Sequence, residues 1–236
     1  MEALLLAGGK GERLGNAAQG RPKPLVHVAG APLAAYSIAR FAKAGVARVV
    51  VACAAGQEDL FESELDGLGP EIVAVGESEP LGRGGGLRRA AAARLESGPV
   101  IAANGDEILD LDLEVVLAAH RERAPAATIV VAPLPSAFGV VELADDDVVG
   151  FQEAGRLPHW VNAGLYVLED EAIERLPERG DHETTTFPEL AAERRLAAFR
   201  HEGLWLTVNT PKDLRRAEEL LASRPNWRPA GIAAAR

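Results

Sequence analysis

The sequence predicts an α/β protein in which helices sandwich a mostly parallel central sheet. Short apolar runs alternate along the chain with amphipathic stretches of helix length, the pattern of repeated strand–helix units. The chain has 236 residues, of which 47% are hydrophobic and 25% charged, as in an ordinary globular protein. A chain of this length can bury roughly 70–75% of its surface on folding, so a sizeable core is expected.

Eight apolar runs are expected to form strands. They cover residues 3–6, 48–53, 71–75, 100–103, 128–132, 139–143, 161–168 and 197–201. Six further stretches carry a helical pattern and are expected to form helices. They cover residues 32–44, 58–65, 84–95, 113–123, 187–195 and 211–221.

Three residues mark expected helix starts. Pro32 suits a first turn, because a residue there needs no backbone N–H. Asp112 and Thr210 each precede an expected helix and are predicted N-caps, since their side-chain oxygens can accept hydrogen bonds from free N–H groups.

The charge balance excludes several classes of partner. With 25 Lys+Arg against 35 Asp+Glu, the net charge of −10 argues against binding nucleic acid or an anionic membrane. No apolar run approaches the ~20 residues that span a bilayer, and residues 1–7 lack the basic start of a signal peptide. We therefore expect a cytoplasmic protein with no nucleic-acid or membrane partner. The single cysteine, Cys53, lies in an apolar run and is expected to be a buried thiol.

A glycine-rich turn follows the first expected strand. Three of its residues, Gly8, Gly9 and Gly11, fall within four positions, so the backbone can turn tightly and present N–H groups to phosphates. The spacing matches neither the G-x-G-x-x-G of dinucleotide sites nor the Walker A loop.

Basic residues surround this turn. Lys10 and Arg13 lie in or just after it, and Lys23 stands between two prolines that stiffen its backbone. Preorganised cations of this kind can neutralise a triphosphate and its leaving group. A carboxylate, Asp106, follows the apolar run at 100–103, at the carboxyl end of a strand, where ligand clefts of open α/β sheets lie.

These motifs resemble the sugar-1-phosphate nucleotidyltransferase family, the NDP-sugar pyrophosphorylases. The likeness extends over about residues 1–221, and the chain is similar to a short form without a β-helix domain. It resembles both mannose-1-phosphate guanylyltransferases and N-acetylmuramate-1-phosphate uridylyltransferases. The matching segments are LAGGKGERL at 6–14, RPKPL at 21–25, EPLG at 79–82, NGD at 104–106, FGVV at 138–141, FQE at 151–153, VNAGLY at 161–166, FPEL at 187–190, GLW at 203–205 and NTPKDL at 209–214.

The resemblance implies a Rossmann-like, GT-A-like nucleotidyltransferase architecture. One domain would cover residues 1–222, with a nucleotide-binding half at about 1–132 and a sugar-phosphate half at about 133–210. Residues 223–236 would form a loose tail. The implied reaction is a direct in-line attack by a sugar 1-phosphate on the α-phosphate of an NTP, giving an NDP-sugar and pyrophosphate.

The resemblance also implies roles for individual residues. Arg13 and Lys23 would stabilise the transition state, and Asp106 would bind Mg²⁺. Glu77 would contact the edge of the base. The nucleotide would lie against Leu6, Ala7, Gly8, Gly9, Lys10, Gly11 and Gly82, and the sugar phosphate against Gly139, Glu153 and Asn162.

Three positions depart from the family pattern. Ala154 follows Glu153 where relatives carry a lysine for the sugar's phosphate, and Arg156 is a candidate replacement. Thr207 stands where relatives carry a second metal carboxylate, so Asn209 is the candidate second ligand. The third departure is Arg83, where a small threonine is common.

Several alternatives stay open. A carboxylate at Glu77 accepts hydrogen bonds, and guanine offers it two adjacent donors, which slightly favours guanylyl transfer to a mannose- or heptose-type 1-phosphate. Uridylyl or thymidylyl transfer to another sugar 1-phosphate is the first alternative. A cofactor guanylyltransferase and a non-catalytic nucleotide-binding relative follow, and a homo-oligomer is possible.

Overall fold

A seven-stranded sheet forms the centre of the structure, which is a computed structural model describing residues 1–9, 12–136, 138–153, 155–224, 227 and 229. Its strand order is β12-β8-β11-β6-β1-β4-β5. All neighbouring pairs are parallel except those of β11, which runs antiparallel to both β6 and β8. The predicted mostly parallel sheet is confirmed. The strands are β1 (Glu2–Leu6), β4 (Arg48–Ala54), β5 (Glu71–Glu77), β6 (Val100–Asn104), β8 (Ala127–Pro135), β11 (Arg156–Leu168) and β12 (Leu196–Arg200).

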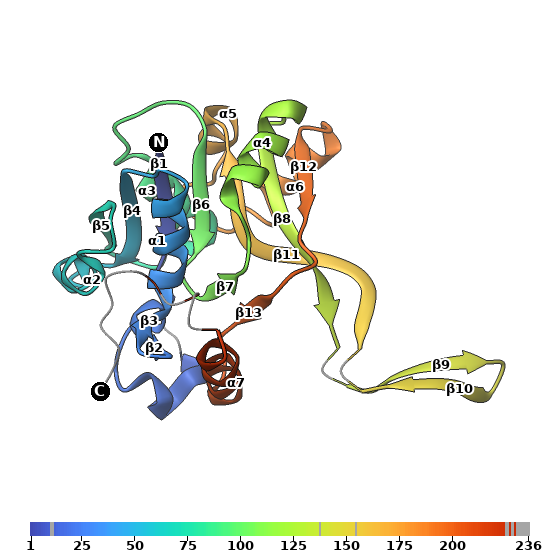
Figure 1. Cartoon of the computed structure of the whole chain (residues 1–236). Helices are drawn as coiled ribbons and strands as arrows, with labels where there is room; N and C mark the ends of the chain where they lie inside the picture. Colours follow the sequence, from blue (N-terminus) through green and yellow to red (C-terminus); the bar gives the residue numbers. More distant parts are fainter. Residues whose placement is uncertain (10–11, 137, 154, 225–226, 228, 230–236) are drawn as a thin grey trace.

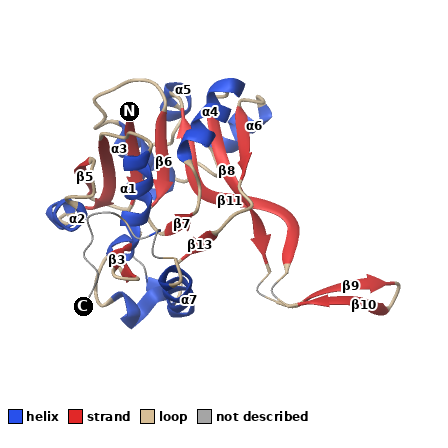
Figure 2. Ribbon diagram, in the orientation of Figure 1, coloured by secondary structure: helices blue, strands red, loops and turns tan. Residues whose placement is uncertain are grey.

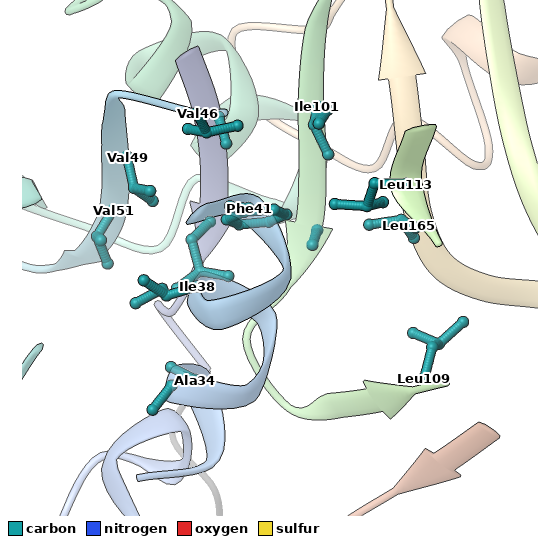
Figure 3. Packing of buried hydrophobic residues seen from close by; sticks show 14 of the residues in the cluster. Ala34, Ile38, Phe41, Val46, Val49, Val51, Ile101, Leu109, Leu113 and Leu165 are labelled. Atoms are coloured by element: carbon teal, nitrogen blue, oxygen red, sulfur yellow. The ribbon is translucent and has the colours of Figure 1, made fainter. Parts of the chain in front are cut away.

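Helices cover both faces of this sheet (Figure 1). Residues alternate between the faces of a strand, so Ala3 and Leu5 of β1 join one buried cluster and Leu4 joins another. The first cluster includes residues of α1 (Leu33–Lys43), α2 (Glu58–Leu65) and α4 (Leu113–Arg123), with Ile38 and Phe41 of α1 packed on the strands (Figure 3). The second includes residues of α3 (Gly82–Ala91), α5 (Asp170–Glu174) and α6 (Thr186–Ala192).

A third buried cluster lies beyond the sheet and joins the start of the chain to its last helix. It unites Leu14, Val28 and Leu33 with Val208 and Leu221. Besides the first part of α1, the contributing elements are η1 (Glu12–Ala18), β2 (His27–Val28), β3 (Ala31–Pro32), β7 (Glu107–Leu109), β13 (Trp205–Thr207) and α7 (Pro211–Ala222). The short helix η2 (Lys23–Leu25) lies between η1 and β2 along the chain. Two small ladders, β2–β3 and β7–β13, belong to this region.

A two-stranded hairpin extends away from the body (Figure 2). It consists of β9 (Val140–Ala144) and β10 (Asp147–Gln152), which pair with each other and with no strand of the main sheet.

The expected strands and helices are present; α2 and α4 have the expected bounds, and other elements have shifted ends. Pro32 was expected inside the first turn of α1, but it pairs with His27 in β3 and the helix begins at Leu33. The helix expected at 84–95 runs instead from Gly82 to Ala91.

The expected caps and the expected buried thiol are confirmed. The Asp112 side chain accepts from the N–H of Glu114, and Thr210 forms a capping box with Asp213. Cys53 is fully buried, and burial raises its pKa to about 12. Within the described ranges, no helix has the length and apolarity to cross a membrane.

Candidate active site

A cavity of about 500 Å³ opens at the carboxyl ends of β1, β5 and β6. This is the edge where an open α/β sheet binds ligands. Except for Asn209, its described lining residues belong to the first 107 positions. They are Leu6, Ala7, Gly8, Gly9, Arg13, Lys23, Pro24, Glu77, Pro80, Gly82, Arg83, Asn104, Asp106, Glu107 and Asn209.

The glycine turn presents bare backbone to this cavity. Among the described residues, a Cβ on Gly9 would meet no atom within 4 Å beyond its chain neighbours, and the nearest atoms to a Cβ on Gly8 would be those of the Glu77 carboxyl group, at 3.5 Å. Packing within the described chain therefore does not require glycine at either position, and the open space fits a close-lying ligand. Lys10 and Gly11, also predicted to bind nucleotide, lie outside the described residues.

Four polar side chains meet at one wall of the cavity. The Lys23 ammonium contacts the Asp106 carboxylate and lies 2.8 Å from Asn209 Oδ1. Arg13 Nη2 donates to the same Asn209 oxygen at 3.3 Å. The Lys23 side chain is only 10% exposed, and these oxygen partners supply the hydrogen bonds that a largely buried ammonium group requires. The residues predicted for catalysis and metal binding thus lie together.

Local structure explains why these side chains converge. Lys23 is the first residue of η2 and stands between Pro22 and Pro24. Asp106 follows β6, and Asn209 lies just before the Thr210 cap of α7. The β7–β13 ladder holds the segment after Asp106 beside the segment before Asn209. The N–H of Val208 also donates to the Asp106 carbonyl.

Glu107 is a site residue that the sequence analysis missed. Burial raises the pKa of its carboxyl group to about 8, against hydrogen bonds from Trp205 Nε1 at 2.8 Å and Asn104 Nδ2 at 3.1 Å. A Cβ on Gly164 would lie 2.6 Å from the Glu107 carboxyl, so this glycine lets β11 approach the acid. Nothing but its position beside Asp106 distinguished it in the sequence.

Glu77 lies at the end of β5 and lines the cavity, as the base-contacting role requires. Its Oε2 accepts from the N–H of Leu81 at 3.2 Å, which orients the carboxylate. A Cβ on Gly86 would lie 2.6 Å from Glu77 Oε1, so that glycine makes room for the acid.

Arg83 lines the cavity and is held by two acids from a distant segment. It forms ion pairs with Asp181 at 2.5 Å and Glu183 at 2.7 Å. Gly82, predicted to bind nucleotide, has a φ of 80°, and a Cβ there would lie 2.5 Å from the Gly180 carbonyl oxygen. Contact with the same segment therefore explains this glycine.

The residues predicted to bind the sugar phosphate do not line the cavity. Asn162 donates to Tyr166 Oη at 2.8 Å and to Glu183 Oε1 at 2.6 Å. It is therefore linked to the cavity-lining Arg83 through Glu183. Arg156 donates to the Glu202 carbonyl at 3.3 Å. Gly139 and Glu153 flank the hairpin, and a Cβ on Gly139 would lie 2.5 Å from the Phe151 ring. Ala154, the departure beside Glu153, lies outside the described residues.

The oxygen donors at the wall fit a divalent cation in type. In the part of the chain that the structure describes, no three His, Cys, Asp or Glu side chains form a metal-binding group. Asp106 and Asn209 nevertheless direct one carboxylate and one amide oxygen to a single point, now contacted by Lys23. Mg²⁺ takes one or two carboxylates and completes its shell with phosphate oxygens and water.

Cations and a carboxylate beside bare backbone, at the carboxyl edge of a mostly parallel sheet, define a nucleotide-binding α/β protein. The chain belongs to the nucleotidyl transferase family, which matches residues 2–224.

Curated relatives are mannose-1-phosphate guanylyltransferases. One from Mycobacterium tuberculosis is 33% identical over 228 residues, 92% of this chain and 63% of the relative. Mannose-1-phosphate guanyltransferase beta-A from Xenopus laevis is 32% identical over 248 residues, 98% of this chain and 69% of the relative. The chain thus spans less than two thirds of the first relative's length and slightly more than two thirds of the second's.

Solved structures share the fold. An inositol-1-phosphate CTP transferase from T. maritima superposes with a TM-score of 0.75 at 21% identity, covering 98% of this chain and 97% of that one. HddC from Yersinia pseudotuberculosis gives 0.72 at 23% identity, covering 93% and 99%.

Proposed function

We propose that this protein transfers a nucleotidyl group from an NTP to a sugar 1-phosphate, releasing pyrophosphate. The observation that carries this proposal is the convergence of Arg13, Lys23, Asp106 and Asn209 beside the bare glycine turn. Such a wall suits a polyphosphate, because fixed cations stabilise the charge that develops as the phosphoryl bond breaks.

The proposed step is a single displacement. A phosphate oxygen of the sugar 1-phosphate bonds to the α-phosphorus while the bond to the bridging oxygen breaks, and its electrons leave with pyrophosphate. Arg13 and Lys23 neutralise the α- and β-phosphates. Asp106 and Asn209 would hold Mg²⁺, which would supply Lewis-acid stabilisation of the same oxygens.

Guanine is the proposed base. Glu77 lines the cavity with an oriented carboxylate, which can accept from the N1–H and 2-amino groups of guanine. The curated relatives are named guanylyltransferases of mannose 1-phosphate, and HddC was solved with GMP-PN. A mannose- or heptose-type 1-phosphate is therefore the proposed acceptor, with uridylyl or thymidylyl transfer as the alternative.

The acceptor is proposed to bind on the Arg83 side of the cavity. Asn162 reaches this side through Glu183, which pairs with Arg83. Gly139, Glu153 and Arg156 stay proposed contacts that would have to approach the cavity when the acceptor binds. Arg156→Ala should then raise the KM for the sugar phosphate more than that for the NTP, and equal effects would exclude Arg156 as a phosphate ligand.

The division of the domain into two halves and the cytoplasmic location are part of the same proposal. The cavity draws all but one of its described lining residues from 1–132, which supports the division into a nucleotide half and a sugar-phosphate half. The NTP requirement and the single buried thiol favour the cytoplasm.

The test incubates the protein with each NTP and dTTP, a panel of sugar 1-phosphates and Mg²⁺, and detects products by mass spectrometry. A new NDP-sugar mass, lost on chelation and absent with Asp106→Asn, supports the proposal and identifies base and sugar class. NTP binding without product in any combination would exclude it and favour a binding-only relative.

A further inference from the structure

Glu107 lines the cavity, and the proposed reaction gives it no role. The residue is 9% exposed and directly follows Asp106. Its two carboxyl oxygens accept hydrogen bonds from different segments, Oε2 from Trp205 Nε1 at 2.8 Å and Oε1 from Asn104 Nδ2 at 3.1 Å. One buried side chain therefore joins the end of β6, the start of β7 and the start of β13.

The two proposed cation ligands lie beside this bridge. Asp106 immediately precedes Glu107, and Asn209 lies four residues after Trp205. In the β7–β13 ladder Glu107 pairs with the last residue of β13, and beyond this pair the N–H of Val208 donates to the Asp106 carbonyl at 3.3 Å. The spacing between Asp106 and Asn209 therefore depends on how β7 lies against β13.

The ladder between β7 and β13 is short. The two strands lie side by side, pair three residues each and form a two-stranded sheet of their own (Figure 1). A lone pair of strands is marginally stable by itself. A hydrogen bond from a buried side chain on one strand to the other adds a constraint that the backbone pairs lack, and it is strengthened by its removal from water.

The backbone of β11 covers the contact between Asn104 and Glu107. Gly164 of β11 has a φ of 70°, and a Cβ there would lie 2.5 Å from Asn104 Nδ2 and 2.6 Å from the Glu107 carboxyl group. The other amide atom of Asn104, Oδ1, is buried and has no hydrogen-bond partner among the described residues. The bond to Glu107 therefore orients this amide, which also lines the cavity.

We propose that Glu107 is a positioning residue: its bonds to β6 and β13 set the spacing between Asp106 and Asn209. This inference rests on the proposed function, because it requires a cation at those two residues. Mg²⁺ demands near-ideal octahedral geometry, so its affinity is sensitive to ligand spacing. Both oxygens of Glu107 already accept hydrogen bonds, which favours positioning over direct binding of the cation.

Three variants separate position from charge. Glu107→Leu removes both hydrogen bonds at a similar side-chain size. Glu107→Gln is neutral but can keep both, because its carbonyl accepts from Trp205 and its NH₂ group donates to Asn104 Oδ1 once that amide turns over. Trp205→Phe removes one donor from the other end of the bridge and keeps an aromatic ring.

Calorimetric titration of the full chain measures the cation site without turnover. The probes are the α,β-methylene analogues of GTP and UTP, each titrated with Mg²⁺ and with EDTA in its place. The gain in nucleotide affinity from Mg²⁺ should fall by about 10-fold or more in Glu107→Leu, the usual effect of removing a group that holds a metal ligand in place. It should fall less in Trp205→Phe and stay at the wild-type level in Glu107→Gln.

The matched control is Glu169→Leu. Glu169 also accepts from a ring N–H, that of His120 Nε2 at 3.0 Å. It follows β11, whose last residue pairs with Val100 at the end of β6 away from the cavity. This variant should keep the wild-type gain from Mg²⁺, and far-UV circular dichroism checks that every variant folds.

A wild-type gain in Glu107→Leu would overturn the inference. An equal loss in Glu107→Gln and Glu107→Leu would also overturn it, because charge rather than position would then matter. If Glu107→Leu does not fold, Trp205→Phe decides, and a wild-type gain there is the contrary result. A wild type that binds neither analogue more tightly with Mg²⁺ would instead overturn the proposed function, and this inference with it.

Discussion

Arg83 and Glu183 bind each other through two hydrogen bonds, 2.9 Å from Nη1 to Oε1 and 2.7 Å from Nη2 to Oε2, although 100 residues separate them. Arg83 lines the cavity from α3, while Glu183 also accepts from Asn162 of β11. The pair therefore connects the Arg83 side of the cavity to β11, the strand whose Asn162 is proposed to contact the acceptor. Lysine could not replace this arginine, because it lacks the planar two-donor geometry.

This pair should contribute measurably to stability. A double-mutant cycle with Arg83→Met and Glu183→Gln should give a coupling energy of about 1 kcal/mol, since the pair is bidentate but partly solvated. Urea unfolding of the four proteins measures it. The coupling should decrease in 1 M NaCl, and a salt-independent value would mean that charge does not hold the two residues together.

Asp106→Asn should remove most turnover while preserving the fold. The substitution keeps the shape of the side chain but removes the charge that contacts Lys23 and would bind the cation. We expect kcat to fall by about 10²-fold or more, the usual effect of removing one preorganised charge. Steady-state kinetics measure this, with far-UV circular dichroism to check folding.

Asp110→Asn is the matched control, because Asp110 accepts from the N–H of Leu204 and does not line the cavity. Equal turnover in the two variants would contradict a direct role for Asp106.

His182 should make stability pH-dependent in the acid range. The ring is fully buried between Tyr166 and Phe187, and neither ring nitrogen has a hydrogen-bond partner among the described residues. Burial lowers its pKa from 6.5 to about 4, against the pull of the Asp181 and Glu183 carboxylates. Between these values the unfolded chain binds more protons, so stability is present above pH 6.5 and is lost as the pH falls toward 4.

The loss from this group reaches up to about 3 kcal/mol. Urea unfolding at pH 7.5, 6, 5 and 4 should show a smaller pH dependence for His182→Gln than for the wild type. His159→Gln, at an exposed position, should keep the wild-type dependence. An unchanged pH dependence in His182→Gln would assign the effect to other groups.

Two glycines near the cavity should respond differently to alanine. A Cβ on Gly84 would lie 2.7 Å from Pro177 and 2.8 Å from the backbone N of His182, so Gly84→Ala should cost about 1–3 kcal/mol of stability. Gly9→Ala should change stability by less than about 0.5 kcal/mol, because a Cβ there comes within 4 Å of no described residue apart from its chain neighbours.

The same Gly9→Ala change should weaken NTP binding, since the new methyl group would occupy cavity space. Calorimetric titration with a non-hydrolysable nucleotide measures this. Unchanged affinity would show that the nucleotide does not approach Gly9.

The sequence predicted the helices and strands that form because of a residue pattern within their own segment. The bounds expected for α2 and α4 match at both ends, and the runs that became β1, β4 and β6 are buried apolar segments of the expected kind. The three-residue strands β7 and β13 escaped prediction, because their ladder pairs residues nearly 100 positions apart and neither has a pattern of its own.

The site residues likewise fall into those that local motifs predict and those that depend on the tertiary fold. Motifs that resemble the family indicated Arg13, Lys23 and Asp106, which line one wall. The buried state of Glu107 and the pairing of Arg83 depend on Trp205, Asp181 and Glu183, whose approach only the tertiary fold determines. The hairpin residues Gly139 and Glu153 were expected at the site, but the strands beside them lead away from it.

The β7–β13 ladder has a consequence for synthesis on the ribosome. All seven strands of the main sheet lie before residue 201, yet Asn209 arrives with β13 and the cap of α7. Domains generally fold as the nascent chain emerges from its N-terminal side. A growing chain can thus complete its main sheet while Lys23 and Asp106 still lack Asn209 as their third partner, so this wall of the cavity is assembled only after the sheet is complete.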